Sequence, residues 1–171
     1  MTPSAFITVL QNAKPSAEKL RAAGLNDDEI DDIHRSLTAT ERIASHPGSP
    51  GNELEQLLAD YDCSSLEIGR VTFLDQPIGC EHGVMIGRHE GDTLVIRNDG
   101  SVVLCDHEES AHQVRCAVDP DHFLDGLAAF VSIVNDRRAW RGKGTAAADS
   151  CAAAAGVAEC PTFYLSLCGF L

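Results

Sequence analysis

Two pairs of cysteine and histidine residues have a spacing that places a thiol beside an imidazole. Cys80 precedes His82, and Cys105 precedes His107, each with one residue between them. Because side chains alternate between the two faces of a strand, each pair would project from one face. Two such pairs on neighbouring strands would supply the ligands of a Cys2His2 zinc site. The alternative is that the cysteines face the core and the histidines end the strands.

A cysteine-dependent enzyme is a second hypothesis for the same residues. The chain has seven cysteines and seven histidines, so pairs of this kind arise easily by coincidence. A catalytic thiol needs electropositive surroundings, whereas both Cys80 and Cys105 lie in acidic stretches. With an odd number of cysteines and no CxxC pair, we expect buried thiols and no disulfide framework. A small zinc- or cysteine-dependent enzyme using Cys80, His82, Cys105 and His107 remains the alternative function.

Three carboxylates follow the second of these pairs closely, at Asp106, Glu108 and Glu109. Glycosidase chemistry uses two positioned carboxylates, usually beside aromatic side chains that hold the sugar. The chain has only one Trp and two Tyr, which weakens that option. A solvated loop after a strand accounts for the three acids, and the same loop can serve as a contact surface for a basic protein. We therefore predict Asp106, Glu108 and Glu109 as partner-binding residues, and no catalytic or metal-binding residues.

Charge and motifs narrow the function further. Asp and Glu number 26 against 13 Lys and Arg, giving a net charge of −13. This disfavours nucleic acid and anionic membranes as partners and favours a basic one. GxGxxG, Walker, GxSxG and HExxH motifs are absent, and we expect no cofactor. The apolar run 123–134 is shorter than the roughly 20 residues of a membrane span, and without a signal peptide we expect a cytoplasmic protein.

The secondary structure that would position these residues is predicted to be helices, then strands, then helices, in order along the chain. Thr2 and Pro3 begin a first helix, and Asn26 with Glu29 forms a capping box that explains the acids of 27–32. Asn52 begins an amphipathic helix over 53–61. Strands are expected at 66–74, 83–88, 93–97, 101–107 and 112–118. Asp99-Gly100 between two apolar runs predicts a hairpin.

The C-terminal part is predicted to be helical. Asp119 and Pro120 have the residue types that begin a helix, which we expect to run to about Asn135. The basic tract after it lies where cations stabilise a helix end, and contact with nucleic acid is the less favoured interpretation. Its residues are Arg137, Arg138, Arg141 and Lys143. An Ala-rich helix over 146–155 and an apolar segment over 162–171 follow. The sequence thus predicts one α+β domain: N-terminal helices, an antiparallel sheet of about five strands, and C-terminal helices packed on it.

This order of elements resembles the SUKH superfamily, which groups bacterial toxin-immunity proteins with the Syd protein and yeast cell-wall regulators. The resembling stretches are LEIGRVTFL (66–74), GDTLVIRNDGSVVLCDHE (91–108), and FLDGLAAF (123–130). Residues 51–171 would form the SUKH-like α+β domain. Residues 1–50 would be a helical N-terminal extension of that domain.

The resemblance implies a non-enzymatic cytoplasmic protein that binds and neutralises a cognate bacterial toxin or effector. The net charge of −13 independently favours a basic toxin, because it would accelerate association with a basic surface. A regulatory interaction module is the further alternative that the resemblance leaves open. The identity of the toxin and the oligomeric state do not follow from the sequence.

Overall fold

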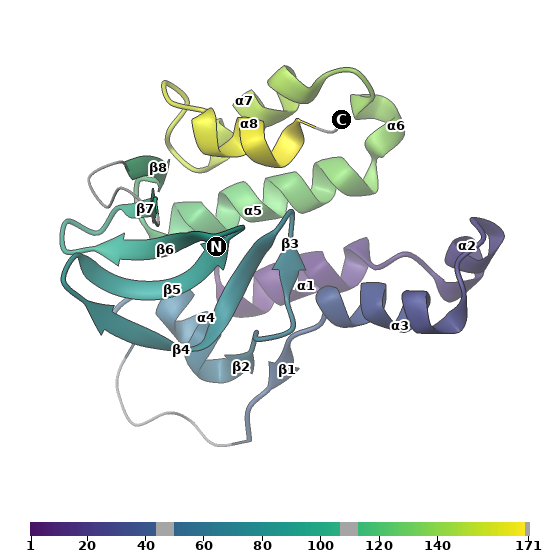
Figure 1. The fold of residues 1–171 in the computed structure, drawn as a ribbon, viewed down its shortest axis with the longest axis horizontal. Helices are drawn as coiled ribbons and strands as arrows, with labels where there is room; N and C mark the ends of the chain where they lie inside the picture. Colours follow the sequence, from purple (N-terminus) through teal and green to yellow (C-terminus); the bar gives the residue numbers. More distant parts are fainter. Residues whose placement is uncertain (44–49, 107–112, 170–171) are drawn as a thin grey trace.

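The computed structural model describes residues 1–43, 50–106 and 113–169 (Figure 1). In these ranges the fold combines helices with a curled antiparallel sheet, and it confirms the predicted α+β class. No described helix has the length and apolar character needed to cross a membrane.

The N-terminal helices begin at the residues that the sequence predicts. Thr2 Oγ1 accepts the Ala5 N–H at 3.4 Å, and Asn26 and Glu29 exchange the two hydrogen bonds of a capping box. At the fourth helix Asn52 accepts the Glu55 N–H, but the Glu55 carboxylate accepts the Gly51 N–H instead of completing a box. The helices are α1 (Pro3–Ala13), α2 (Ala17–Ala22), α3 (Asp27–Ser36) and α4 (Glu53–Asp60).

The main sheet is an antiparallel meander of six strands in sequence order. Its strands are β3 (Glu67–Ile68), β4 (Val71–Cys80), β5 (Gly83–His89), β6 (Asp92–Arg97), β7 (Val102–Cys105) and β8 (Gln113–Ala117). A second, two-stranded sheet pairs β1 (Thr40–Glu41) with β2 (Tyr61–Asp62). Register irregularities in β4 and β5 interrupt the ladder, which is consistent with the curled shape of the sheet in Figure 1.

The predicted first strand, 66–74, is two strands joined by a tight turn. Gly69 and Arg70 both have positive φ, 57° and 69°, as a two-residue hairpin turn requires. Gly69 also lies against the core, because a Cβ there would come within 2.7 Å of the Phe130 ring. The apolar pattern of 66–74 runs through this turn without a break, which is why sequence alone reads it as one strand.

The C-terminal helices follow the sheet as α5 (Pro120–Asn135), α6 (Arg137–Trp140), α7 (Gly144–Ala154) and α8 (Thr162–Cys168). Asp119 caps α5 by accepting the His122 N–H at 2.8 Å. Figure 1 shows α7 and α8 lying along one side of α5, with α1 on the other. The first two residues of the basic tract, Arg137 and Arg138, begin the short helix α6 directly after α5.

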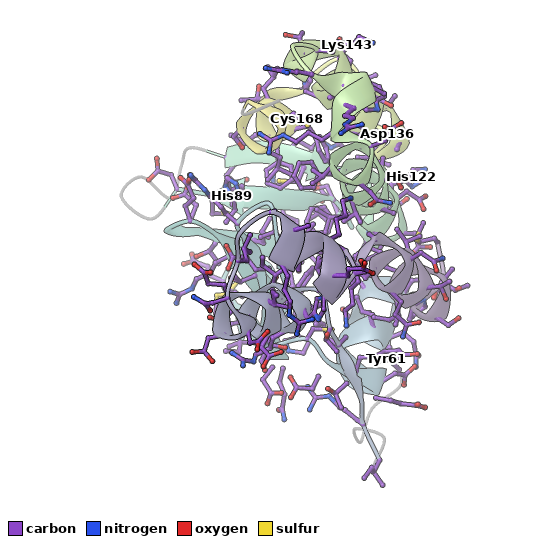
Figure 2. All side chains as sticks on the ribbon, turned by 90° about the vertical axis from the view of Figure 1, so that its right-hand side faces the viewer. Tyr61, His89, His122, Asp136, Lys143 and Cys168 are labelled. Carbon is purple, nitrogen blue, oxygen red and sulfur yellow. The ribbon has the colours of Figure 1, made fainter. Side chains whose placement is uncertain are left out.

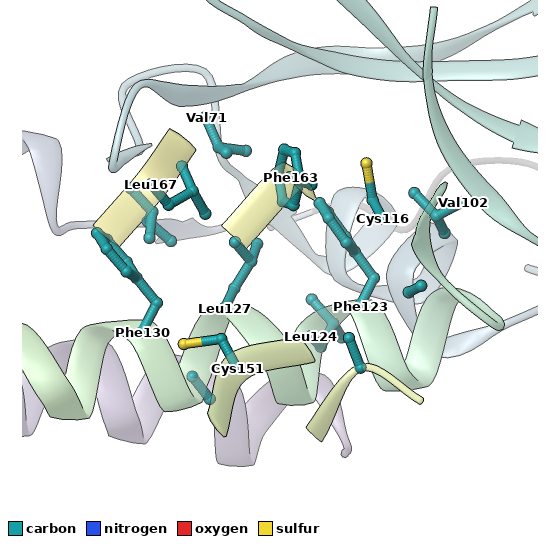
Figure 3. Close-up of a cluster of buried hydrophobic side chains, with 14 of the residues drawn as sticks. Val71, Val102, Cys116, Phe123, Leu124, Leu127, Phe130, Cys151, Phe163 and Leu167 are labelled. Atoms are coloured by element: carbon teal, nitrogen blue, oxygen red, sulfur yellow. The ribbon is translucent and has the colours of Figure 1, made fainter. Parts of the chain in front are cut away.

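A single large hydrophobic cluster holds these elements together (Figure 3). In the close-up, side chains of α5 such as Phe123 and Leu127 point toward Phe163 of α8 and Val71 of the sheet. Phe6 of α1 and Leu57 of α4 are fully buried in the same cluster. Only 5% of the residues are aromatic, and α7 contributes small side chains to the core: Ala147, Ala148, Cys151 and Ala152.

Candidate functional site

The Asp99-Gly100 hairpin places the first predicted contact residue, Asp106, at an end of the sheet. Gly100 has φ 86°, and the Asp99 carboxylate accepts hydrogen bonds from the backbone and hydroxyl of Ser101, at 2.9 and 2.6 Å. These two donors hold the pKa of Asp99 below its ordinary value. β7 then pairs with β6, with Cys105 opposite Thr93. The half-buried Asp106 follows directly.

The other two predicted contact residues, Glu108 and Glu109, lie outside the described residues. The structure therefore places one of the three acids, and the contact loop as a whole stays a prediction. The described residues do show the structural setting of Asp106. Asp106 follows a strand that is buried along its whole length, so its backbone position is fixed by the sheet.

The cysteine and histidine pairs do not assemble into a metal site in the described part of the chain. Cys80 and His82 are exposed at the β4–β5 turn, whereas Cys105 is buried on β7. The register puts Cys80 and Cys105 on the same face of the sheet but at opposite ends of β6. His107 lies outside the described ranges. Within those ranges, no three His, Cys, Asp or Glu side chains are grouped so that they could hold a metal ion.

Three of the buried thiols, those of Cys63, Cys105 and Cys116, are poor nucleophiles. Burial, assisted by the neighbouring Asp62 carboxylate, raises the pKa of Cys63 to about 12. Burial also raises the pKa of Cys116 well above its ordinary value. For Cys105, burial is again the main cause of a raised pKa, and the Cys80 thiol adds a smaller electrostatic contribution. These thiols stay protonated at neutral pH, and only Cys80 and Cys160 of the seven are exposed.

An acidic hollow of about 520 Å³, absent from the sequence-based predictions, lies where the first turns of α4 and α5 meet. The Glu53 N–H donates to the Asp121 carboxylate at 3.3 Å and links the two helix starts. Asp119 faces the same space from its capping position. The full lining is Pro50, Gly51, Asn52, Glu53, Gln56, Asp119, Pro120 and Asp121.

The Asp119 carboxylate of the acidic hollow remains ionised at neutral pH. Partial burial raises the pKa of Asp119, but hydrogen bonds from His122 outweigh it and keep that pKa below its ordinary value. The His122 ring nitrogen Nδ1 lies 2.8 Å from both Asp119 carboxylate oxygens, and the side chain is on the outer surface at the start of α5 (Figure 2). The Met1 ammonium group pairs with Asp125 at 3.1 Å nearby. The hollow is thus a surface that a cationic group can approach.

Sequence reasoning identified both caps, Asn52 and Asp119, but not their convergence. Each cap is a local signal that fixes the start of one helix. That the two starts face each other depends on how α4 and α5 pack against α1 and the sheet. No local pattern carries that information, since the two segments are separated by the whole sheet.

An apolar groove of about 340 Å³ separates the α2–α3 pair from the body of the protein. Its walls come from α1, α3, β3 and the C-terminal half of α5, and include Ile33, Leu37, Phe130 and Val134. Ile30 of α3 is only 3% exposed, yet it belongs to neither of the two clusters of buried hydrophobic residues. Its side chain is therefore buried outside the main core. A polar contact links α3 to the connection between α1 and α2, where His34 Nε2 lies 2.9 Å from the Pro15 carbonyl.

Comparison of the chain with protein-family models, with curated proteins and with solved structures finds no significant match. Function must therefore be inferred from the chain itself.

Proposed function

We propose that this chain is a non-enzymatic immunity protein that binds and neutralises a cognate bacterial toxin with a basic contact surface. The observation that carries the proposal is the excess of acidic over basic residues, 26 against 13. Residues 1–136 contain 24 of the acids and only 9 of the basic residues. A cytoplasmic location and the absence of catalysis are part of the same proposal.

Local structure uses only part of this acidity. Asp27 pairs with Arg21 at 2.9 Å, and Asp32 pairs with Arg35 at 2.7 Å. Both pairs are well exposed, so they contribute little to stability and leave the α3 surface acidic. Glu53 and Asp121 add negative charge at the acidic hollow. An acidic surface of this kind accelerates association with a basic partner and disfavours nucleic acid.

The order of strand, hairpin and helix supports the proposal through its resemblance to the SUKH superfamily. In that superfamily, immunity proteins act by binding a toxin and blocking its active site. We propose Asp106, Glu108 and Glu109 as the contact residues, because Asp106 directly follows β7 and the two glutamates follow it closely in the sequence. The acids of 27–32 on α3 are the alternative contact surface.

The test is the association rate with the product of the adjacent gene. The variant Asp106→Lys/Glu108→Lys/Glu109→Lys should slow association about tenfold or more at low salt and leave the circular dichroism spectrum unchanged.

A matched control reverses Asp136, Asp149 and Glu159, three exposed acids in the C-terminal part of the chain. It makes the same change in net charge away from the proposed contact. Equal slowing by both variants would show that only net charge acts. No slowing by the first variant would move the contact to another acidic surface.

A further inference from the structure

The apolar groove between the α2–α3 pair and the body of the protein is a cavity that the proposed function does not use. Its volume of about 340 Å³ lies within the range of pockets that bind small molecules. This volume corresponds to about eleven waters of the liquid, so a ligand of roughly ten non-hydrogen atoms fits into it. The free amino acid leucine is about this size.

The groove is lined by apolar side chains that the chain itself does not cover fully. Ile33 of α3 and Leu37 directly after α3 are half-buried, and so is Val134 on the body side, in α5. α2 buries no residue and α3 buries only Ile30, so the α2–α3 pair does not close the groove. A ligand can therefore remove apolar surface from water that still reaches it.

Two opposite charges lie on the two sides of the groove. Lys19 comes from α2 and Glu67 from β3, and both residues are exposed. Neither side chain has an ion pair among the residues that the structure describes. Asn135, the last residue of α5, is the remaining polar residue of the lining. The groove thus offers one cation and one anion beside an apolar surface.

We propose that the apolar groove binds a free α-amino acid with a large aliphatic side chain. Both charged groups of such a ligand are ionised at neutral pH. Its carboxylate pairs with Lys19 and its ammonium group pairs with Glu67. Its side chain packs on Ile33, Leu37 and Val134. This inference goes beyond the proposed function.

The charges of the groove favour this class of ligand over two related ones. An apolar carboxylate would leave Glu67 unmatched, and the net charge of −13 would repel it. An apolar amine would leave Lys19 unmatched. A zwitterion matches both side chains and has no net charge on which that repulsion could act.

The experiment is an NMR titration of the full chain with L-leucine at millimolar concentration. We expect saturable shift changes at the methyl groups of Ile33, Leu37 and Val134. Glycine has the same charged groups without the side chain and should leave these signals unchanged. Leucinamide and N-acetyl-leucine each lack one of the two charges, and each should bind about fivefold more weakly than leucine, because an exposed ion pair contributes modestly.

Two variants test the assignment of the two charges. Lys19→Met should weaken leucine binding about fivefold and leave leucinamide binding unchanged, because leucinamide has no carboxylate to pair. Glu67→Gln should weaken leucine binding about fivefold and leave N-acetyl-leucine binding unchanged. Matched changes at exposed residues outside the groove, Lys143→Met and Glu159→Gln, should bind leucine as the parent does. Thermal melting shows whether each variant is folded.

Absence of shift changes at the three groups of methyl signals with leucine, or equal shift changes with glycine, would overturn the proposal. Equal weakening by the groove variants and by their controls would also overturn it. Tighter binding of octanoate than of leucine would overturn it in favour of an apolar carboxylate. The series of ligands tests the proposal on the parent protein even where a variant does not fold. None of these outcomes bears on the binding of a basic toxin elsewhere.

Discussion

Gly126, in the middle of α5, provides a sharp test of how α5 and α8 pack. A Cβ at this position would lie 2.1 Å from the Tyr164 hydroxyl, 2.8 Å from its ring carbon Cζ and 3.0 Å from the Ala155 Cβ. Ordinary contacts are about 3.5–4.0 Å, so the helices must separate or Tyr164 must move. Tyr164 is fully buried and has no room to move freely.

Two opposing effects set the magnitude for Gly126→Ala. Overpacking a core costs about 1–3 kcal/mol, and a clash this short belongs at the upper end. Replacing a helix glycine by alanine returns about 1 kcal/mol through helix propensity. We therefore expect a net loss of about 2 kcal/mol, which lowers the melting temperature by roughly 4–8 °C in a chain of this size.

The partner variant is Tyr164→Phe, which removes the atom of closest contact. The Tyr164 hydroxyl is buried without a hydrogen-bond partner among the described residues, so its removal alone should be neutral or stabilising by up to about 1 kcal/mol. In the double variant the destabilisation by Gly126→Ala should fall by about 1 kcal/mol. The assay is urea unfolding of all four proteins. If Gly126→Ala stabilises the protein, or if the double-mutant cycle shows no coupling, the packing described for α5 and α8 is wrong.

Three further predictions concern titration, thiol exposure and helix capping. Burial lowers the pKa of His89 from its ordinary 6.5. At pH values between the folded pKa and 6.5, the unfolded chain therefore binds more protons than the folded protein. The free energy of unfolding thus falls as the pH falls, by at most about 1.4 kcal/mol per pH unit. Unfolding measured at several pH values should show that His89→Gln loses this pH dependence of stability, whereas a control variant of the exposed His82 keeps it. A thiol reagent should modify Cys80 and Cys160 rapidly in the native protein and the other cysteines only after unfolding; rapid reaction of more than two thiols would contradict the described burial. Asp119→Ala removes the cap of α5 and should cost about 1 kcal/mol in unfolding experiments, whereas the exposed Asp149→Ala should cost little.

The helix starts were predictable because their signals are local. Asn26 with Glu29, and Asp119 with Pro120, combine a side-chain acceptor with a suitable first turn, and the structure places helices at both. The Asp99-Gly100 hairpin was predictable for the same reason, since the turn requires residues that tolerate its backbone.

Features that depend on distant segments could not be predicted. The turn at Gly69 and Arg70 is hidden by a continuous apolar pattern, and its geometry is accommodated by Phe130, far along the chain. The acidic hollow needs α4 and α5 to meet end to end. In each case the site is made by tertiary packing and not by spacing in the sequence.

The most direct test of the proposed function is calorimetric titration of the purified chain with the product of the adjacent gene, at low and at high salt. We predict a stoichiometric complex that weakens as salt increases, because salt screens the attraction between the acidic surface and the basic partner. We also predict that forming the complex abolishes the toxicity of the partner. A partner that neither binds at low salt nor loses its toxicity would contradict the assignment of this chain as an immunity protein.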